Sequence, residues 1–281
     1  MKIVRRFALF AAAAGIALLT AGHAAAQTTT IRVALCQIFC VDGDRAGNFV
    51  RMENALAEAR QKGADLACFP ECAVLGWVNP DAHRRAYPIP GPDSDRLCEL
   101  AKKYRMHVCA GLDEKDGTNL YDTAVLISDE GKLLLKHHKM HNLDNDHLIE
   151  PPYTSGHDIR AVDTKLGRIG LLICADTFID DFLRKMADLK PGLVLVPYGW
   201  VGAENDWPGH GQNLVNVVRH AAEVIGAPVV GTDSVGEVTH GPWAGRTYGG
   251  FSNVSDRRGQ TLAVAKDRDR DVLIVPIEVG R

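Results

Sequence analysis

Apolar residues recur along this chain at two spacings, one typical of strands and one typical of helices. Ile31, Val33 and Leu35 occupy every second position, which predicts a strand with one buried face. Residues 49–59 then carry apolar side chains three or four positions apart, which predicts a helix, and Gly63 is expected to end it.

The same spacings predict the remaining elements. Asp129, Glu130 and Gly131 are typical of a tight turn and indicate a hairpin. Further strands are expected at 66–69, 108–112, 124–127, 133–135, 171–174, 193–196, 229–231 and within 251–275, and further helices at about 97–104, 178–189 and 214–225. Mixed strands and helices without a regular repeat favour an α/β layered sandwich in a single domain.

The first 26 residues have a different pattern. A basic start precedes an apolar stretch at 7–19, and small residues follow at 24–26. This order is typical of a signal peptide with a cleavage site. We therefore expect residues 1–26 to be removed and 27–281 to form an exported domain, periplasmic or secreted. The alternative is a permanent anchor, but the apolar stretch is shorter than the ~20 residues that a spanning helix needs.

Composition narrows the class of protein. The chain has 281 residues, of which 46% are hydrophobic, so it can bury one large core. A net charge of -3 gives no basic excess that would indicate a nucleic-acid partner. Seven cysteines follow the signal segment, so at least one is free unless chains are cross-linked. A disulfide between Cys98 and Cys109 is an open alternative at this point.

Three chemically active side chains follow separate strand-like segments. Cys174 comes after the apolar run 169–173, and Glu71 follows Phe69 and Pro70. Lys139 lies between them in sequence, just after another strand-like segment. A thiol, a carboxylate and an amine can serve as nucleophile, base and electrophilic cation in acyl transfer through a thioester.

These segments resemble the motifs of the carbon–nitrogen hydrolase (nitrilase) superfamily. The resemblance covers about residues 31–279. It rests on Ala67-Cys68-Phe69-Pro70-Glu71, His138-Lys139-Met140-His141 and Ile169-Gly170-Leu171-Leu172-Ile173-Cys174-Ala175-Asp176, with echoes at 90–92, 119–124, Gly156 and 249–252. It implies an α-β-β-α sandwich of the nitrilase type and a catalytic set of Glu71, Lys139 and Cys174.

The resemblance also implies a mechanism. Glu71 would take the thiol proton of Cys174, and the thiolate would attack a carboxamide or nitrile carbon. Lys139 and the backbone N–H of Ala175 would stabilise the oxyanion. Among supporting residues, Glu150 is the expected second glutamate. No cofactor and no metal are implied, and the substrate would be a small amide or nitrile.

The residues after the nucleophile favour one reaction over the other. Nitrilases proper usually carry Trp and then Glu after the cysteine, whereas Ala175 and Asp176 stand there in this chain. We therefore expect carboxamide hydrolysis rather than nitrile hydrolysis.

A metal site is the main alternative. The chain could instead be a periplasmic metal-binding protein that uses a histidine-rich cluster between His137 and His147. Its other members would be His138, His141, Asp144 and Asp146. No His-Glu-x-x-His pattern is present, so we interpret His141 as a residue that holds the lysine loop in place. A serine hydrolase is disfavoured, since the chain contains no Gly-x-Ser-x-Gly.

Two further expectations concern the pocket and the assembly. Aromatic residues near the motifs are expected to divide between pocket and core: Trp77, Tyr153, Phe178, Tyr198, Trp200 and Trp207. Phe178, Phe182 and Met186 recur every four positions and form one apolar stripe. We expect this stripe, or the terminal strand region, to support a homodimer or a higher even oligomer.

Overall fold

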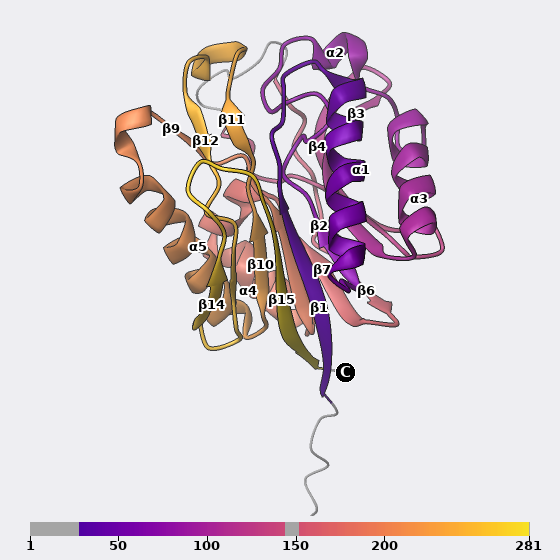
Figure 1. The fold of residues 1–281 in the computed structure, drawn as a ribbon, viewed down its shortest axis with the longest axis vertical. Helices are drawn as coiled ribbons and strands as arrows, with labels where there is room; N and C mark the ends of the chain where they lie inside the picture. Colours follow the sequence, from indigo (N-terminus) through magenta and orange to yellow (C-terminus); the bar gives the residue numbers. More distant parts are fainter. Residues whose placement is uncertain (1–27, 144–151, 281) are drawn as a thin grey trace, which may run out of the picture.

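A computed structural model describes residues 28–143 and 152–280, and it has four layers (Figure 1). Two mixed sheets pack against each other in the middle, and helices cover the outer face of each sheet. The expected α-β-β-α sandwich is confirmed.

The first sheet has strand order β15-β1-β2-β3-β4-β5. Its strands are β1 (Thr28–Gln37), β2 (Leu66–Cys68), β3 (His107–Asp116), β4 (Asn119–Ile127), β5 (Leu133–His138) and β15 (Asp271–Gly280). The central strands β1, β2 and β3 are parallel, and the outer strands pair antiparallel. Side chains of β2 alternate between faces, because Leu66 and Cys68 point between the sheets while Ala67 packs under the helices.

The second sheet has strand order β14-β13-β10-β8-β7-β6. Its strands are β6 (Ala161–Thr164), β7 (Gly167–Leu171), β8 (Leu193–Pro197), β10 (Val229–Thr232), β13 (Asn253–Ser255) and β14 (Thr261–Val264). Here too the central strands β7, β8 and β10 are parallel. A small third sheet, β11-β12-β9, consists of β9 (Val201–Gly202), β11 (Val235–Glu237) and β12 (Thr247–Gly249).

Five α-helices occur in the described part of the chain: α1 (Arg45–Gln61), α2 (Ala82–Arg85), α3 (Pro92–Tyr104), α4 (Asp180–Asp188) and α5 (Gly209–Ile225). Asp44 caps α1 by accepting the N–H of Gly47 at 3.0 Å, and Pro92 begins α3. Gly226, with a φ of 73°, ends α5 in the left-handed conformation that glycine tolerates. Helices α1 and α3 cover the first sheet, and α4 and α5 cover the second.

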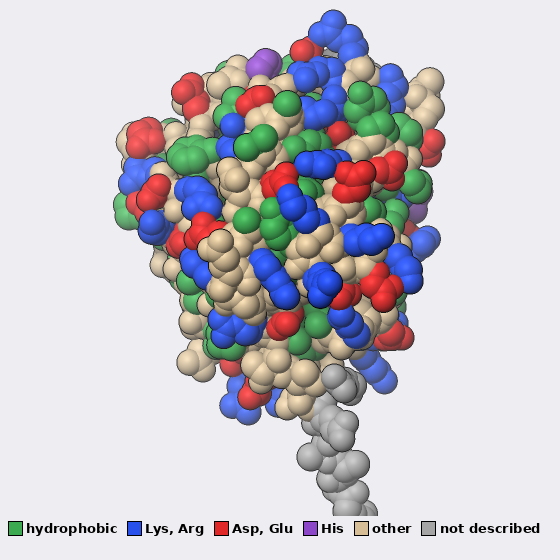
Figure 2. All heavy atoms as spheres, turned by 45° about the vertical axis from the view of Figure 1, so that its right-hand side comes forward, with side chains coloured by type: hydrophobic (Ala, Val, Ile, Leu, Met, Phe, Trp, Pro, Cys, Tyr) green, Lys and Arg blue, Asp and Glu red, His purple; other side chains and the backbone are tan. Residues whose placement is uncertain are grey.

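Ion pairs connect the two helices of the outer layer over the first sheet. Glu53 on α1 binds Arg96 at 3.0 Å and Lys103 at 2.5 Å, both on α3. On the face displayed in Figure 2, acidic and basic side chains are interspersed rather than segregated. Exposed pairs of this kind each stabilise a fold by only about 0.2–1 kcal/mol. In the described part of the chain, no helix is both long and apolar enough to span a membrane.

The topology brings several strand ends to one edge of the sandwich. Strands β5 and β7 contact each other across the two sheets, as do β3 and β8. The backbone N–H of Glu71, just after β2, donates to the carbonyl of Tyr198, just after β8, at 3.2 Å. The carboxyl ends of β2 and β8 are therefore joined at the edge where sites in open sheets form.

Two local predictions were wrong. Strand β7 ends at Leu171, so Cys174 does not end a strand but begins a 3-10 helix, η2 (Cys174–Phe178). The reason is local, because the Thr177 hydroxyl donates to the carbonyl of Cys174 at 2.6 Å and tightens the turn.

Because η2 precedes α4, that helix starts at Asp180, and Phe178 is not part of it. The expected stripe is therefore broken. Met186 and Leu183 are buried against the protein's own core, whereas Phe178 is 42% exposed.

Candidate active site

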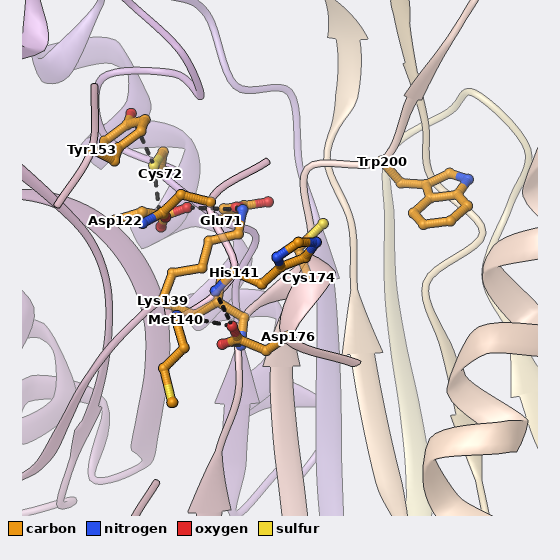
Figure 3. A network of polar contacts seen from close by, with 12 residues as sticks. Glu71, Cys72, Asp122, Lys139, Met140, His141, Tyr153, Cys174, Asp176 and Trp200 are labelled. Carbon is orange, nitrogen blue, oxygen red and sulfur yellow. Dashed lines mark hydrogen bonds and ion pairs between the residues drawn. The ribbon is translucent and has the colours of Figure 1, made fainter. Parts of the chain in front are cut away.

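The three expected catalytic side chains meet at the edge of the sandwich. Glu71 follows β2, Lys139 follows β5, and Cys174 follows β7. Their exposed fractions are 2%, 1% and 4%, so all three lie below the surface. Figure 3 shows the side chain of Lys139 reaching toward Glu71 and Asp122, with Cys174 beside them.

Lys139 is surrounded by acceptors. Its Nζ donates to Oε1 of Glu71 and lies 3.3 Å from Oδ2 of Asp122. Its backbone N–H donates to the carbonyl of Asp122 at 2.8 Å. Burial alone would lower the pKa of Lys139, but the charges of Glu71 and Asp122 outweigh it and raise that pKa well above the ordinary range. The lysine is therefore a permanent cation at neutral pH.

Glu71 has one oxygen free for chemistry. Oε1 accepts from Lys139, whereas Oε2 has no hydrogen-bond partner among the described residues. Burial raises the pKa of Glu71 well above its ordinary value, Lys139 opposes this increase, and Asp122 adds to it. A carboxylate with a raised pKa holds a proton more tightly and is a stronger base.

Gly199 leaves room for the free oxygen of Glu71. A Cβ at this position would lie 2.8 Å from Oε2 of Glu71 and 3.4 Å from Cγ of Trp77. A side chain here would therefore push into the carboxylate. The N–H of Gly199 also donates to the sulfur of Cys174, so one glycine lies next to both the carboxylate and the thiol.

Cys174 occupies a conformation that is unusual for a residue with a side chain. Its φ is 38°, in the left-handed region that residues with a Cβ seldom adopt. Burial raises the pKa of Cys174 most, and the charge of Glu71 raises it further, while Lys139 and the Gly199 N–H lower it. Burial dominates, so the pKa of Cys174 is raised and the resting group is a neutral thiol.

The 3-10 helix η2 begins at Cys174 itself. Ala175 lies in the first turn of this helix, where N–H groups have no acceptor within the helix. Such groups stabilise negative charge that develops next to them. The role of the Ala175 N–H as an oxyanion donor stays a prediction.

A buried aspartate joins the lysine segment to the cysteine turn. Oδ1 of Asp176 accepts the backbone N–H groups of Met140 and His141, both at 2.9 Å (Figure 3). Oδ2 accepts the N–H of Ile173 at 3.0 Å and lies 2.9 Å from Nε2 of His137. His141 is thus held through its backbone, and the residue that holds the loop is Asp176.

A second buried network extends from the ion pair and was missed by the sequence analysis. Asp122 accepts from the thiol of Cys72 at 3.5 Å, and that sulfur lies 3.9 Å from the hydroxyl of Tyr153. The Tyr153 hydroxyl donates to Asp113 at 2.7 Å. Burial raises the pKa of Asp113 to about 8. Asp113 and Asp122 are close in sequence, but all other pairs of residues in this network are 31 or more positions apart. No spacing pattern could therefore have indicated the network.

A pocket of about 270 Å³ opens onto Cys174. Of the six aromatic residues singled out in the sequence, Trp77, Phe178 and Trp200 line it, and Trp243, which was not foreseen, lines it as well. Tyr198 and Trp207 are not among the lining residues and are buried beside it. Tyr153 also lies outside the pocket, in the network with Asp113. The pocket is small by the standard of ligand sites, which favours a small substrate.

The remaining predicted site residues fall into two groups. Glu150, His147, Asp144 and Asp146 lie outside the described residues. Of the histidines that are described, His137 faces Asp176, and Nε2 of His138 lies 2.8 Å from Glu114. Within residues 28–143 and 152–280, no group of three or more potential ligands is arranged to hold a metal ion.

Comparison with known proteins identifies the family. The sequence model of the family described as Carbon-nitrogen hydrolase matches residues 32–281. The chain therefore belongs to the carbon-nitrogen hydrolase family, as its motifs indicated.

Individual relatives divide between two named activities. The chain is 31% identical over 167 residues to a bifunctional nitrilase/nitrile hydratase from Nicotiana tabacum, covering 53% of this chain and 48% of that protein. It is 32% identical over 175 residues to an omega-amidase from Bos taurus, covering 60% of this chain and 63% of that protein. The chain thus spans about half the length of the first curated relatives it matches.

Solved structures support the fold. A mutant of an amidase of the nitrilase superfamily from Nesterenkonia superimposes with a TM-score of 0.75 at 22% identity, covering 88% of this chain and 90% of that one. Another structure of that amidase carries the acetamide moiety of fluoroacetamide on its active-site cysteine.

Proposed function

We propose that this protein hydrolyses the carbon–nitrogen bond of a small carboxamide, with Cys174 as nucleophile. The observation that carries this proposal is the buried ion pair of Glu71 and Lys139 beside Cys174, which lines the pocket. The family and the amidase relatives support the same chemistry.

The first half-reaction would form a thioester. Glu71 takes the thiol proton through its free Oε2 as the sulfur of Cys174 attacks the amide carbon. The oxyanion is stabilised by the Lys139 ammonium and the Ala175 N–H, and loss of one such donor typically costs ~3 kcal/mol. Because the resting thiol is neutral, we expect its proton to move as the carbon–sulfur bond forms. The carbon–nitrogen bond then breaks, and Glu71 returns the proton to the departing nitrogen.

The second half-reaction would restore the enzyme. Water enters after the ammonia or amine has left, and Glu71 takes a proton from it. The hydroxide equivalent attacks the thioester carbon, and the carbon–sulfur bond breaks. Glu71 returns the proton to the thiolate, and the carboxylic acid leaves and ionises in water. No cofactor takes part in this scheme.

Nitrile hydrolysis is the second candidate, because the first relatives include nitrilases. We favour the amide because Ala175 and Asp176 follow the nucleophile in place of Trp and Glu. Product analysis with matched amide and nitrile pairs tests this choice. We expect faster turnover of the amide, and faster turnover of the nitrile would contradict it.

We further propose that residues 1–26 are a signal peptide and that the mature chain is exported. The basic, apolar and small-residue order of this segment supports the proposal. Intact-mass analysis of protein from its native compartment should find an N-terminus at or near Gln27. A cytosolic form that retains residues 1–26 would exclude it.

Assembly into a homodimer or a higher even oligomer is the last part of the proposal. Phe178 and Phe182 both remain at least partly exposed near α4, on the outer layer of the sandwich. Association through this layer would couple the pocket wall, to which Phe178 belongs, to the assembly.

A further inference from the structure

An aromatic wall leads from the reacting groups to the mouth of the pocket. The Nζ of Lys139 lies 5.6 Å from the centre of the Trp77 ring. The Trp77 ring centre lies 5.8 Å from that of Trp243, with the two planes tilted by 56°. Both rings line the pocket, so an acyl group bound at Cys174 would extend along them.

A cation stands at the outer end of this wall. Arg246 lines the pocket, and its Cζ lies 4.5 Å from the centre of the Trp243 ring. Hydrogen bonds fix its backbone, because its N–H donates to the carbonyl of Trp243 at 3.0 Å and its carbonyl accepts from Val238 at 2.9 Å. The guanidinium is therefore carried by an ordered turn beside a flat ring.

The guanidinium N–H donors of Arg246 have no acceptor among the described residues. Its guanidinium forms no ion pair or hydrogen bond with any residue in the described part of the chain, whereas Arg268 nearby is paired with Glu204 at 2.8 Å. Other polar groups of the pocket are engaged. Oδ2 of Asp206 accepts the N–H of Ala203 at 3.0 Å, and Nε2 of His210 lies 2.9 Å from the carbonyl of Val201.

We propose that Arg246 is a specificity-determining residue that binds a carboxylate at the far end of the acyl group. This rests on the proposed function and deepens it, because it defines the substrates as amides with a flat or apolar acyl group that ends in an anion. A guanidinium offers paired N–H donors that match a carboxylate, and stacking on an aromatic ring preserves that geometry. The rings of Trp77 and Trp243 would contact the apolar part between the two ends.

Three amides of one carbon skeleton test the proposal. Their far ends carry a carboxylate, a methyl group or an ammonium, and kcat/KM is measured for each with wild-type, Arg246→Gln, Arg246→Lys and Asp206→Asn proteins. We expect wild type to favour the carboxylate over the methyl compound by about tenfold. Arg246→Gln should bring this ratio close to one, mainly by raising KM, and Arg246→Lys should keep part of it. Arg258→Gln, an exposed arginine outside the pocket, should leave the ratio unchanged.

Several outcomes would overturn the proposal. The first is a wild-type enzyme whose kcat/KM shows no preference for the carboxylate amide. The second is a preference for the ammonium amide that Asp206→Asn removes. The third is an Arg246→Gln protein whose kcat/KM falls by the same factor on all three amides. If neutral amides are turned over through Cys174 without charge preference, the proposed function stands and only the role of Arg246 fails. If no amide is hydrolysed, both fail.

Discussion

At the scale of single residues, the site depends on two carboxylates that share one lysine. Asp122 and Glu71 both contact the Lys139 ammonium, and Glu71 must be ionised to accept the thiol proton. The negative charge of Asp122 raises the pKa of Glu71 beyond the effect of burial. Asp122 is therefore expected to act on the reaction through Lys139 and Glu71 without touching the substrate.

The pH profile of Asp122→Asn should show this effect. Removing the negative charge lowers the pKa of Glu71, so the acidic limb of kcat/KM should move to lower pH while the maximal rate falls. Glu114→Gln is the matched control, because Glu114 is also buried but binds Lys136 and His138 instead. An acidic limb that stays in place in Asp122→Asn, or moves equally in both variants, would contradict this role.

At the scale of elements, the site depends on the junction between the end of β5 and η2. Asp176 alone accepts three backbone N–H groups, two from the lysine segment and one from the cysteine turn. These bonds orient Lys139 and Cys174 relative to each other. Asp176 itself is fully buried, so losing one of its acceptor oxygens leaves N–H groups without a partner.

Asp176→Asn should therefore impair both stability and activity. The amide nitrogen cannot accept a hydrogen bond, so the free energy of unfolding should fall by about 2–4 kcal/mol. Turnover should fall even under conditions where the variant is fully folded. Denaturant titration and kinetics would measure both effects, with Asp181→Asn, an exposed acid on α4, as the control. Wild-type turnover in folded Asp176→Asn would show that this junction does not set the geometry.

Elements with long apolar patterns were predictable from sequence, and short ones were not. β1, β8, α1 and α5 were expected close to their observed positions, because each buries a continuous apolar face. β9, β11 and β12 have two or three residues each and no such pattern. The positions of Glu71, Lys139 and Cys174 could be inferred from motifs. Asp122 lies in the motif-like stretch 119–124, but its contact with Lys139 comes from the tertiary fold, as do the places of Trp243 and Arg246.

At the scale of the whole molecule, the four layers leave two helical outer faces. α4 turns Leu183 and Met186 inward, and Phe182 stays partly exposed beside Lys185, whose Nζ lies 5.6 Å from its ring centre. An even oligomer formed through this layer would place a second subunit near the wall of the pocket. The other outer layer, α1 and α3, is covered with paired charges instead.

Phe182→Asp tests the assembly. Burying a new carboxylate in an apolar interface is costly, so the variant should dissociate at concentrations where wild type remains associated, and its activity should fall. Val50→Asp on α1 is the control, since Val50 is 58% exposed on the opposite layer. Sedimentation of wild type, Phe182→Asp and Val50→Asp at micromolar concentration would measure their association states. A fully active wild-type monomer would exclude the proposed assembly.

The central claim is that Cys174 is the nucleophile of an amide hydrolase. The most direct measurement is ammonia release from a panel of small primary amides by wild-type and Cys174→Ala proteins. We predict ammonia from wild type and only background release from Cys174→Ala, with unchanged folding, because the substitution removes a single sulfur atom at the wall of the pocket. Substantial release by Cys174→Ala, or no release by wild type from any amide, would contradict it.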